Sequence, residues 1–489
     1  MSRPSLLIIL LCSVSLFCAT ASAQDLCPVG TASDKLVCVI PQVFGVNGLQ
    51  VANGNHQGHF EASFLSSSFR PLDSAVARQV ALLPLASPSS GITFAWDAAA
   101  KVFIPSTDSF GPVLSDRAET IGKYRVFVAF DYQNFNFNTI DGISLKQLPV
   151  VLTHADDSNP QDNVPSNTKC TINPNPNATS PMESNTGPCG FVRDVVRTNN
   201  RIDLKIHQFT TFFTFGLTNR IDVSIAIPIE NIRLGMSSDA TIGHNDTNSR
   251  FDHVFTPRAD CPPPASTTPC LQQSFSNFGS ASGIGDITLR VKAAAWKGEH
   301  AGLALGADVR LPTGDSLNFL GAGAAGVKPF VIFSYRARVS PHAFVGYETN
   351  GSSVIAGDIS TGKKDRLPGD LAYSAGADVW LTKRLTFAAD IVGQEIFQAR
   401  RTVISSFTEL GQCQDSLSAQ CDPNLPFLTP KVDSVISQAT NSYNVTNLSL
   451  GLKVKPVGSL LVTGNVLIKL NDGGLRSRYV PLIGMSYTF

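Results

Sequence analysis

The chain has 489 residues, and its 38 Lys and Arg balance 38 Asp and Glu, so the formal net charge is zero. A neutral chain lacks the basic excess that phosphate binding requires, which argues against a nucleic-acid partner. Charged residues make up 16% of the chain, below the roughly 25% of ordinary soluble proteins. The 38 Gly and 30 Pro argue against a mainly helical fold.

The N-terminus has the parts of a secretory signal peptide. Arg3 precedes an apolar stretch over residues 6–17, and Ala21-Ser22-Ala23 forms a cleavage site. We expect residues 1–23 to be removed and the mature chain to begin at Gln24. Beyond this segment no run of about 18 apolar residues occurs, so we expect an exported protein without a transmembrane helix.

The cysteines fit an oxidising compartment. Two of the ten lie in the signal peptide, and the other eight fall into four couples that are close in sequence. Eight cysteines allow 105 connectivities. Local pairing is the simplest, because each couple sits in one polar, Pro- or Asn-rich stretch. A metal site is disfavoured, because no C-x-x-C spacing occurs. The predicted disulfides are Cys27–Cys38, Cys170–Cys189, Cys261–Cys270 and Cys413–Cys421.

Period-two alternation organises the chain from its first third onward. In residues 286–295, apolar residues at odd positions alternate with charged or small residues, which predicts a strand with one apolar face. A short turn leads into a second such segment, and antiparallel pairing would place Arg290 opposite Asp308. Twelve such segments are predicted, over residues 123–137, 201–217, 220–229, 286–295, 302–311, 327–339, 342–350, 371–381, 384–393, 448–455, 460–470 and 478–489.

The connections between these segments alternate in length. Short turns lie on one side, and the longer segments 138–200, 238–281, 312–325, 351–370 and 398–441 lie on the other, with one short exception at 471–475. This asymmetry is typical of outer-membrane barrels, which have short periplasmic turns and long external loops. A closed barrel also satisfies the backbone hydrogen bonds in lipid. We predict an all-β transmembrane antiparallel barrel of about twelve strands, embedded in outer-membrane lipids.

The C-terminal strand alternates up to the last residue. Tyr487, Met485 and Ile483 share one face and the chain ends in Phe489. Such an ending resembles the signal by which the barrel assembly machinery recognises its clients. It implies the cell outer membrane as the location, with Phe489 and Tyr487 as the assembly signal.

Several glycine-rich motifs carry a resemblance to a known family. They are Gly283-Ile284-Gly285-Asp286, Arg310 to Asp315, Phe319-Leu320-Gly321, Gly326 to Phe330, Gly346-Tyr347-Glu348 and Tyr373 to Asp378. Over about residues 283–394 the chain resembles the outer-membrane transporter family named for a meta-pathway of phenol degradation. That family is similar to the long-chain fatty-acid and aromatic-hydrocarbon channels. The resemblance implies a channel for passive uptake of small hydrophobic or aromatic compounds.

Residues 24–120 lie outside the strand count and precede a barrel predicted over 121–489. In the fatty-acid channels an N-terminal segment plugs the lumen, and the resemblance implies a periplasmic or plug-like segment here. The segment holds a possible hairpin over residues 92–97 and 101–105. Insertion of that hairpin in the wall would give the alternative count of fourteen strands.

The predicted inner face carries charges of both signs. Two interpretations remain open: ion pairs that simply fill the interior, and a selectivity filter. Ten basic residues against five acidic ones make the wall basic on balance. The candidates are Arg290, Lys292, Arg310, Lys328, Arg336, Arg338, Arg384, Lys453, Lys469 and Arg478, with Asp286, Asp308, Glu348, Asp378 and Asp390.

The second and third strands change their apolar phase at one height. Pairing around their turn sets Gln208 level with Glu230, and Pro228, which cannot donate to the ladder, lies beside them. One interpretation is a shared bulge that opens the wall sideways. The alternative is that the strands already cross the membrane below this height and the pattern resets above it.

Enzyme motifs are absent from the sequence: it has no G-x-S-x-G, H-E-x-x-H or Walker A pattern. We expect no enzyme, no cofactor and no metal site. His56 and His59, like Asp156, Asp157 and Asp162, are interpreted as loop residues. The alternatives are a structural or general porin-like barrel without a specific substrate and, less favoured, a lumenal hydrolase. His207 and His342 are the candidate inward histidines for that hydrolase.

Overall fold

The structure is a computed structural model of the chain. The signal peptide, the loop histidines and aspartates named above, and five of the eight remaining cysteines lie outside the described residues. The structure describes residues 26–28, 30–52, 60, 69–80, 83, 94–97, 102–105, 109–153, 171–172, 182–184, 187–188, 194–243, 253–256, 270–359, 361–408 and 432–489.

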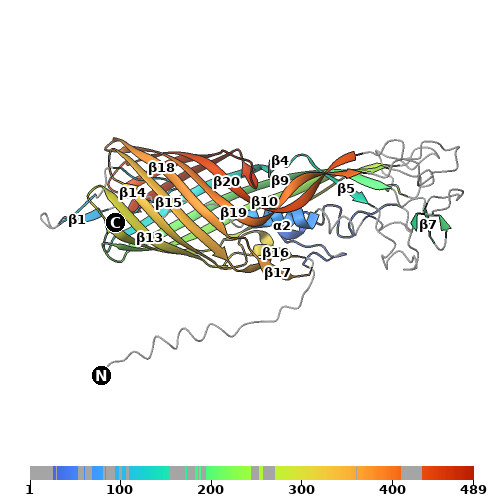
Figure 1. Ribbon diagram of the computed structural model, residues 1–489, viewed down its shortest axis with the longest axis horizontal. Helices are drawn as coiled ribbons and strands as arrows, with labels where there is room; N and C mark the ends of the chain where they lie inside the picture. Colours follow the sequence, from blue (N-terminus) through green and yellow to red (C-terminus); the bar gives the residue numbers. More distant parts are fainter. Residues whose placement is uncertain are drawn as a thin grey trace, which may run out of the picture.

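Twelve antiparallel strands close into a barrel, as predicted (Figure 1). Each strand pairs with the next along the chain, and the last pairs with the first, where Leu482 lies opposite Gln133. Closure leaves no free edge in the ring, which is what lipid requires of a spanning sheet. The strands are β3 (Val126–Ile140), β9 (Val195–Gly216), β10 (Ile221–Gly243), β12 (Thr288–Lys297), β13 (Ala301–Arg310), β14 (Gly326–Tyr335), β15 (Val339–Asn350), β18 (Asp370–Thr382), β19 (Leu385–Thr408), β20 (Val432–Val454), β21 (Leu460–Lys469) and β23 (Tyr479–Thr488).

The N-terminal hairpin is not part of the wall. Strands β1 (Phe94–Asp97) and β2 (Val102–Pro105) pair only with each other. They project from the end of the barrel at which the C-terminus lies (Figure 1). The fourteen-strand alternative is therefore wrong.

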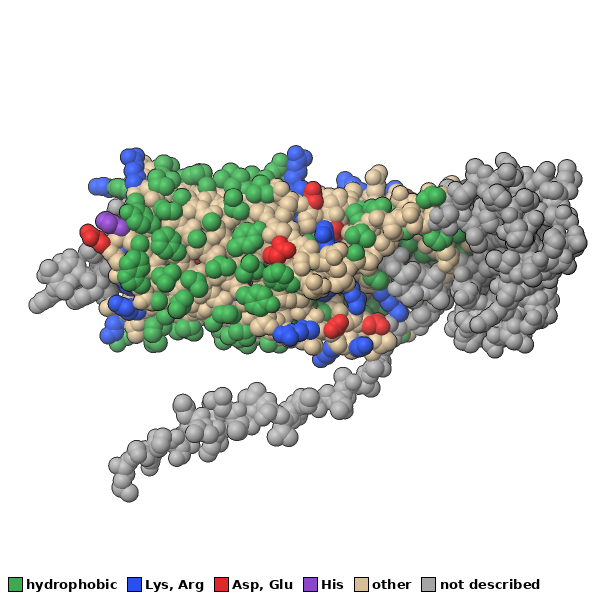
Figure 2. All heavy atoms as spheres, in the orientation of Figure 1, with side chains coloured by type: hydrophobic (Ala, Val, Ile, Leu, Met, Phe, Trp, Pro, Cys, Tyr) green, Lys and Arg blue, Asp and Glu red, His purple; other side chains and the backbone are tan. Residues whose placement is uncertain are grey.

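The barrel wall is apolar outside and polar inside over its shorter strands. Phe130, Phe213 and Met485 are exposed on the outer surface, whereas Thr210 and Thr214 are buried on the inner face. Hydrophobic side chains are spread over the visible outer face of the barrel toward the end at which the C-terminus lies (Figure 2). This is the expected division between a lipid-facing and a lumen-facing surface.

Four strands extend well beyond the others. β9, β10, β19 and β20 are 22 to 24 residues long, so much of the predicted loops 138–200, 238–281 and 398–441 is strand. β5 (Leu148–Thr153) and β11 (Gln272–Ile284) add to this extension by pairing with β9 and β10. It lies at the end where the long connections are (Figure 1).

The extension encloses an apolar core rather than a polar lumen. Helix α2 (Arg70–Val80) places Leu72, Val76 and Val80 at positions i, i+4 and i+8, so one face of the helix is apolar and buried. Leu204 and Ile232 of the surrounding strands pack in the same core. The N-terminal segment thus fills the mouth of the barrel at the long-connection end.

The phase change in β9 and β10 follows from this core. The two strands pair without a register shift from Asp222–Gly216 to Gly243–Val195, and buried and exposed residues alternate throughout. Of the two interpretations, the shared bulge beside Pro228 is therefore wrong, and the alternative, a pattern that resets above the membrane-spanning part, agrees with the structure. The same set of alternate positions faces inward along the whole length of both strands. Only the character of these side chains changes, from polar in the part that spans the membrane to apolar in the extension beyond it.

Smaller elements complete the described structure. Within the described ranges, no helix is both long and apolar enough to cross a bilayer. The remaining elements are η1 (Leu36–Cys38), η3 (Ser316–Asn318), β4 (Ile143–Ser144), β6 (Thr171–Ile172), β7 (Met182–Ser184), β8 (Gly187–Pro188), β16 (Ser352–Asp358), β17 (Lys363–Arg366) and β22 (Leu475–Ser477).

Candidate functional site: an occupied barrel lumen

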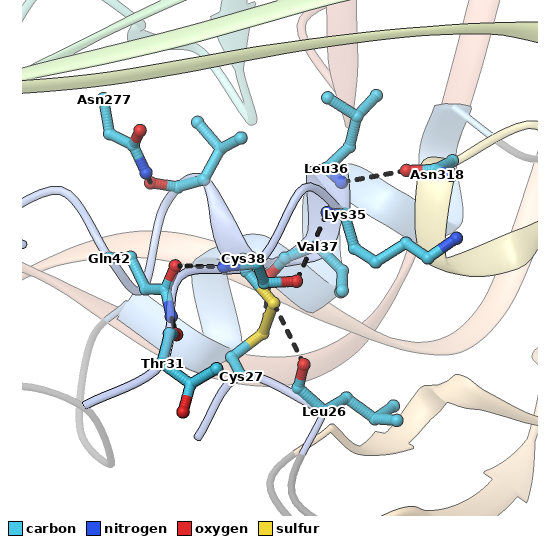
Figure 3. Close-up of a disulfide and its surroundings, with 12 residues drawn as sticks. Leu26, Cys27, Thr31, Lys35, Leu36, Val37, Cys38, Gln42, Asn277 and Asn318 are labelled. Carbon is cyan, nitrogen blue, oxygen red and sulfur yellow. Dashed lines mark hydrogen bonds between the residues drawn. A yellow bond between two sulfur atoms is a disulfide. The ribbon is translucent and has the colours of Figure 1, made fainter. Parts of the chain in front are cut away.

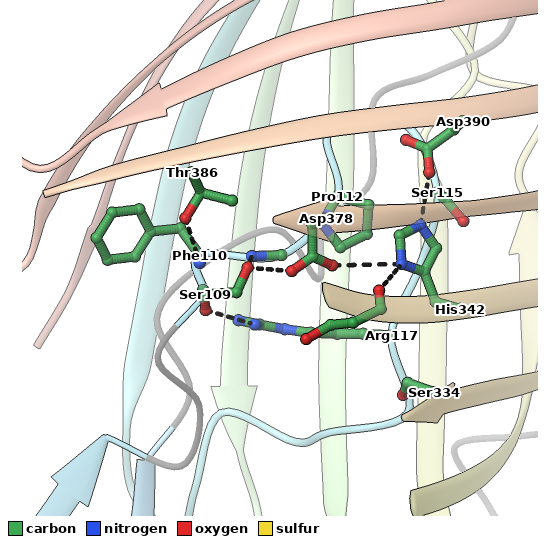
Figure 4. Close-up of polar contacts among 12 residues, drawn as sticks. Ser109, Phe110, Pro112, Ser115, Arg117, Ser334, His342, Asp378, Thr386 and Asp390 are labelled. Atoms are coloured by element: carbon green, nitrogen blue, oxygen red, sulfur yellow. Dashed lines mark hydrogen bonds and ion pairs between the residues drawn. The ribbon is translucent and has the colours of Figure 1, made fainter. Parts of the chain in front are cut away.

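Residues 109–121 run across the inside of the barrel and bind its wall on several sides (Figure 4). The bonds reach strands from different sectors of the ring, so this stretch spans the lumen near the short-turn end. They join the Phe110 amide to Thr386 Oγ1 (3.2 Å), Ser115 Oγ to Ser374 Oγ (2.6 Å), the Ala118 amide to Ser334 Oγ (2.7 Å) and the Ile121 amide to Asp222 Oδ2 (3.1 Å).

Two buried lysines of the wall hold this stretch by its carbonyls. Lys292 Nζ donates to Glu119 O at 2.7 Å, and Lys453 Nζ donates to Phe110 O at 3.2 Å. Both side chains are almost completely buried. Buried ammonium groups need such acceptors, so these two of the predicted inward lysines bind the chain's own backbone.

Arg290 joins the wall to the inner chain by ion pairs. Its Nη1 lies 2.8 Å from Asp116 Oδ2, and its Nε and Nη2 lie 2.6 and 2.8 Å from the two oxygens of Asp308. The predicted pairing of Arg290 opposite Asp308 is confirmed. Arg336 makes a similar contact, with Nη1 3.3 Å from Glu119 Oε1.

The ion pairs continue along the neighbouring strands. Arg310 Nη1 lies 3.0 Å from Asp286 and its Nη2 lies 3.1 Å from Glu348, while Lys328 Nζ lies 3.5 Å from Glu348 and 3.7 Å from Asp308. Each carboxylate thus serves two cations, or a cation and backbone amides. Much of the predicted charged face forms one connected network.

His342 lies between two carboxylates and near the inner chain (Figure 4). Its Nε2 lies 2.5 Å from Asp390 Oδ1 and its Nδ1 lies 3.3 Å from Asp378 Oδ1, while the Ser109 hydroxyl donates to the other Asp378 oxygen. Both ring nitrogens thus face acid oxygens rather than a serine hydroxyl. This geometry does not suit a catalytic base for serine.

The other candidate histidine faces outward. His207 Nδ1 lies 2.8 Å from the Tyr132 hydroxyl, and the two rings stack outside the lumen. The expectation of an inward His207 was wrong, because it assumed that the strand changes its facing at the phase break. Unbroken alternation keeps odd positions of β9 on the outer face.

Four predicted lumen residues lie away from this network. Arg338, Arg384 and Arg478 are exposed, the first two beside short turns, and Arg478 covers the Tyr479 ring with its guanidinium 5.3 Å from the centroid. Lys469 pairs with the loop residue Asp472 at 2.5 Å. The sequence analysis missed the buried arginine Arg476, because β22 is too short to show alternation.

The first predicted disulfide is confirmed (Figure 3). Cys27 and Cys38 are bonded, with their Cα atoms 5.4 Å apart. The closed segment docks on the loop that follows β13: Lys35 Nζ lies 3.0 Å from Asp315, and the Leu36 amide donates to Asn318 at 3.1 Å. Cys270 is disulfide-bonded, and its predicted partner Cys261, like the other two couples, lies outside the described residues.

A cavity of about 270 Å³ separates α2 from the inner chain. Arg78 and Gln79 of α2 line one end, and Leu114 and Asp116 line the other. We call this space the chamber. Its charged wall consists of Arg290, Asp308, Arg310, Lys328, Glu348 and Asp370; its apolar wall consists of Phe135, Phe137, Phe212, Val392, Ile396, Val445, Leu467 and Val480.

Helix α2 carries two buried ionisable groups, Asp73 and Arg78, of which Arg78 lines the chamber. Burial lowers the pKa of the Arg78 guanidinium to about 10, which leaves it charged at neutral pH. Arg78 Nε donates to Ser74 O at 3.0 Å. Burial raises the pKa of Asp73 well above its usual value, and neither of its oxygens has a hydrogen-bond partner among the described residues.

The ladder is irregular next to Pro228, on the edge of β10 that faces β11 and β12 rather than β9. β10 pairs with β11 as far as Ile229–Ile284 and with β12 from Ala226–Thr288, so the regular register stops at residues 285–287, where the Gly285 amide still donates to Pro228 O at 2.8 Å. Gln208 and Glu230 lie level with this break on the inner face, joined by a 2.9 Å hydrogen bond.

Leu320 covers this break from the loop that follows β13. A Cβ at Gly283 would lie 2.9 Å from Leu320 Cδ1, and one at Gly285 would lie 3.1 Å from Leu320 O. Asp286 anchors the loop by accepting from the Gly314 amide at 3.0 Å and the Ala322 amide at 2.8 Å. Only glycine leaves room for the loop to approach so closely.

The closed twelve-strand ring, its apolar outer surface and its occupied polar interior define an outer-membrane β-barrel. Residues 195–405 match the model of the family described as "Putative MetA-pathway of phenol degradation", which confirms the resemblance seen in the sequence. No curated protein sequence matches the chain significantly.

Several solved barrels have a similar fold at low sequence identity. An outer membrane channel from Pseudomonas putida F1 is 9% identical with a TM-score of 0.40, covering 76% of this chain and 98% of that one. A Pseudomonas aeruginosa FadL homologue is 9% identical with a TM-score of 0.29, covering 82% and 96%. A TodX mutant described as a monoaromatic hydrocarbon channel is 9% identical with a TM-score of 0.22, covering 85% and 97%.

Proposed function

We propose that the protein is an outer-membrane channel for passive uptake of small hydrophobic or aromatic compounds. The observation that carries this proposal is the chamber, a space with one apolar wall inside a barrel that is occupied at both ends. Concave, largely apolar sites of this kind bind small molecules. The family match supports the proposal, because that family is named for phenol degradation.

The proposal includes a location in the cell outer membrane. The signal peptide is cleaved so that the chain begins at Gln24, the barrel assembly machinery recognises Phe489 and Tyr487, and lipid surrounds the exposed aromatic face. The long-connection end faces the outside. Residues 24–120 act as a plug, with the contacts of residues 109–121 as support.

A solute has two routes out of the chamber. The axial route requires residues 109–121 to move. The lateral route passes through the break beside Pro228, near Gln208 and Glu230, and requires the loop at Leu320 to move. The glycines at 283 and 285 support the lateral route, because they let a loop pack closely over the wall where the register is irregular, although the Gly285 amide still donates to Pro228 O at 2.8 Å.

A general porin-like barrel is the second candidate. The ion-pair network supports it, because such a network fills a narrow interior without any substrate. The two candidates differ in the role that they give to the chamber. Transport by a selective channel depends on the apolar wall of the chamber, and transport by a general porin does not.

The experiment compares two variants in proteoliposomes. Ala372→Phe fills the chamber, because Ala372 lines it. Val345→Phe adds the same ring on the outer face of an adjacent strand, where Val345 is exposed. We expect wild type to take up toluene faster than a sugar of similar size, Ala372→Phe to lose this uptake, and Val345→Phe to keep it. Equal uptake by all three proteins would contradict the proposal.

A further inference from the structure

The arginines that line the chamber differ in whether a carboxylate contacts their guanidinium. On its charged wall, Arg290 and Arg310 each contact two carboxylates. At the α2 end, Arg78, Arg400 and Arg476 also line the chamber. Within the described part of the chain, none of these three guanidiniums has a carboxylate within ion-pair distance.

The acceptors of Arg78 and Arg476 satisfy hydrogen bonds but do not neutralise charge. Arg476 donates to Asn471 O at 3.2 Å, Thr446 O at 2.6 Å and Asn447 Oδ1 at 2.8 Å. Arg78 donates to Ser74 O and Arg400 O. The C-terminus of α2 offsets part of the Arg78 charge. Both side chains are more than nine-tenths buried, and buried cations require a counterion.

Two contacts bring these arginines to the same end of the chamber as the aromatic wall. Gln79, next to Arg78, accepts a hydrogen bond from the amide of Leu475, next to Arg476. In the pairing of β22 with β3, Ser477 lies opposite Phe137, so Arg476 adjoins the aromatic wall. Phe135 and Phe137 stack there with their ring centroids 5.9 Å apart.

We propose that the chamber binds a small aromatic carboxylate, with its carboxylate between Arg78 and Arg476 and its ring against Phe135 and Phe137. This inference rests on the proposed channel function and narrows its substrate class. A planar carboxylate matches the fork of a guanidinium. A cavity of about 270 Å³ has room for one aromatic ring with its substituent. A neutral hydrocarbon would leave both guanidiniums with only the more distant carboxylates of Asp141 and Asp365, near Arg78, and of Asp472, near Arg476.

Binding to the purified full-length protein in detergent, measured by calorimetry, tests the proposal. The probes are benzoate, benzyl alcohol, which keeps the ring without the charge, and hexanoate, which keeps the carboxylate without the ring. We expect benzoate to bind at least about tenfold more tightly than either, and added salt to weaken only the two carboxylates. Hexanoate binding as tight as that of benzoate would overturn the aromatic assignment.

The variants separate the anion site from general effects on the barrel. Arg476→Gln and Arg78→Gln should each weaken benzoate binding at least about tenfold and leave benzyl alcohol binding unchanged. Arg476→Lys keeps the charge but not the forked geometry of the guanidinium, so its affinity for benzoate should lie between those of wild type and Arg476→Gln. Arg478→Gln is the matched control, because Arg478 is exposed two residues away. Unchanged benzoate binding in the Arg476 variants, with Arg478→Gln as reference, would overturn the proposal even if Arg78→Gln disturbs α2.

Failure of this inference differs from failure of the proposed function. If benzyl alcohol binds and benzoate binds no more tightly, the channel function stands and the proposed anion site is wrong. If neither compound binds and toluene does not cross, the channel function itself fails.

Discussion

The guanidinium of Arg290 in the barrel wall lies 2.8 Å from the carboxylate of Asp116 in the chain that crosses the lumen. The two residues are 174 positions apart in sequence, and both side chains are largely buried. Because Arg290 also binds Asp308, one cation links the inner chain to two neighbouring strands. The wall therefore carries specific contacts for the segment inside it.

Asp116→Asn should loosen the inner chain. The substitution removes one charge and leaves Arg290 paired with Asp308, at a cost on the order of 2 kcal/mol for the docked segment. We expect larger and noisier single-channel conductance in planar bilayers, with the same heat-modifiable migration on gels. Asp203→Asn serves as a control, because Asp203 is exposed beside Lys205. A conductance indistinguishable from wild type would mean that other contacts alone hold the segment.

Leu320→Ala should open the break beside Pro228. The smaller side chain leaves the space at Gly283 uncovered while the Asp286 anchor of the loop stays in place. If solutes leave laterally, the rate of toluene uptake by proteoliposomes should rise. Leu317→Ala, in the same loop, controls for general loosening. Equal rates for Leu320→Ala and wild type would assign transport to the axial route.

Pro228→Val tests the same route in the opposite direction. Valine supplies the backbone N–H that proline lacks and favours a regular strand next to residues 285–287. We expect slower uptake of toluene, with assembly and ion conductance unchanged. Ile227→Val, at the neighbouring position, is the control. Undiminished uptake in a correctly assembled Pro228→Val protein would argue against a lateral exit.

Cys27→Ser with Cys38→Ser should free the N-terminal segment without unfolding the barrel. The disulfide closes a short segment that docks on η3, and its loss should cost about 3 kcal/mol in local stability. We expect faster hydrogen exchange in residues 26–51 and unchanged exchange in β12 to β15. Loss of heat-modifiable migration would instead make the disulfide a requirement of barrel assembly.

Docking of α2 should weaken as pH rises. The pKa of Asp73 is raised by burial, so the folded state binds a proton that the unfolded segment releases. The stability that this proton supplies is complete below the unfolded pKa, near 4, and is lost as pH rises through the raised folded value. The protection of residues 70–80 against hydrogen exchange, corrected for the intrinsic pH dependence of exchange, should therefore fall as pH rises above the unfolded pKa of the carboxyl, near 4. In Asp73→Asn this pH dependence should disappear; its persistence would place the titrating group elsewhere.

The sequence by itself determined the strands and most of their pairing. Period-two alternation is a local property, and a short turn fixes the register of the strands that it joins, which is why Arg290 was placed opposite Asp308. The same pattern predicts the twelve-strand count. The Cys27–Cys38 pair was predictable for a different reason, because the two cysteines lie close along the chain.

Only the tertiary structure decided what lies inside the barrel. The partners of Arg290 and Lys453 include residues 109–121, which carry no periodic pattern and approach the wall only after the ring has closed. The apolar inner face of β9 and β10 left both a bulge and a reset of the pattern open, because the sequence does not reveal that α2 fills that end. Arg476 is buried and Arg478 exposed for the same reason: enclosure depends on the packing of distant segments, which local alternation does not encode.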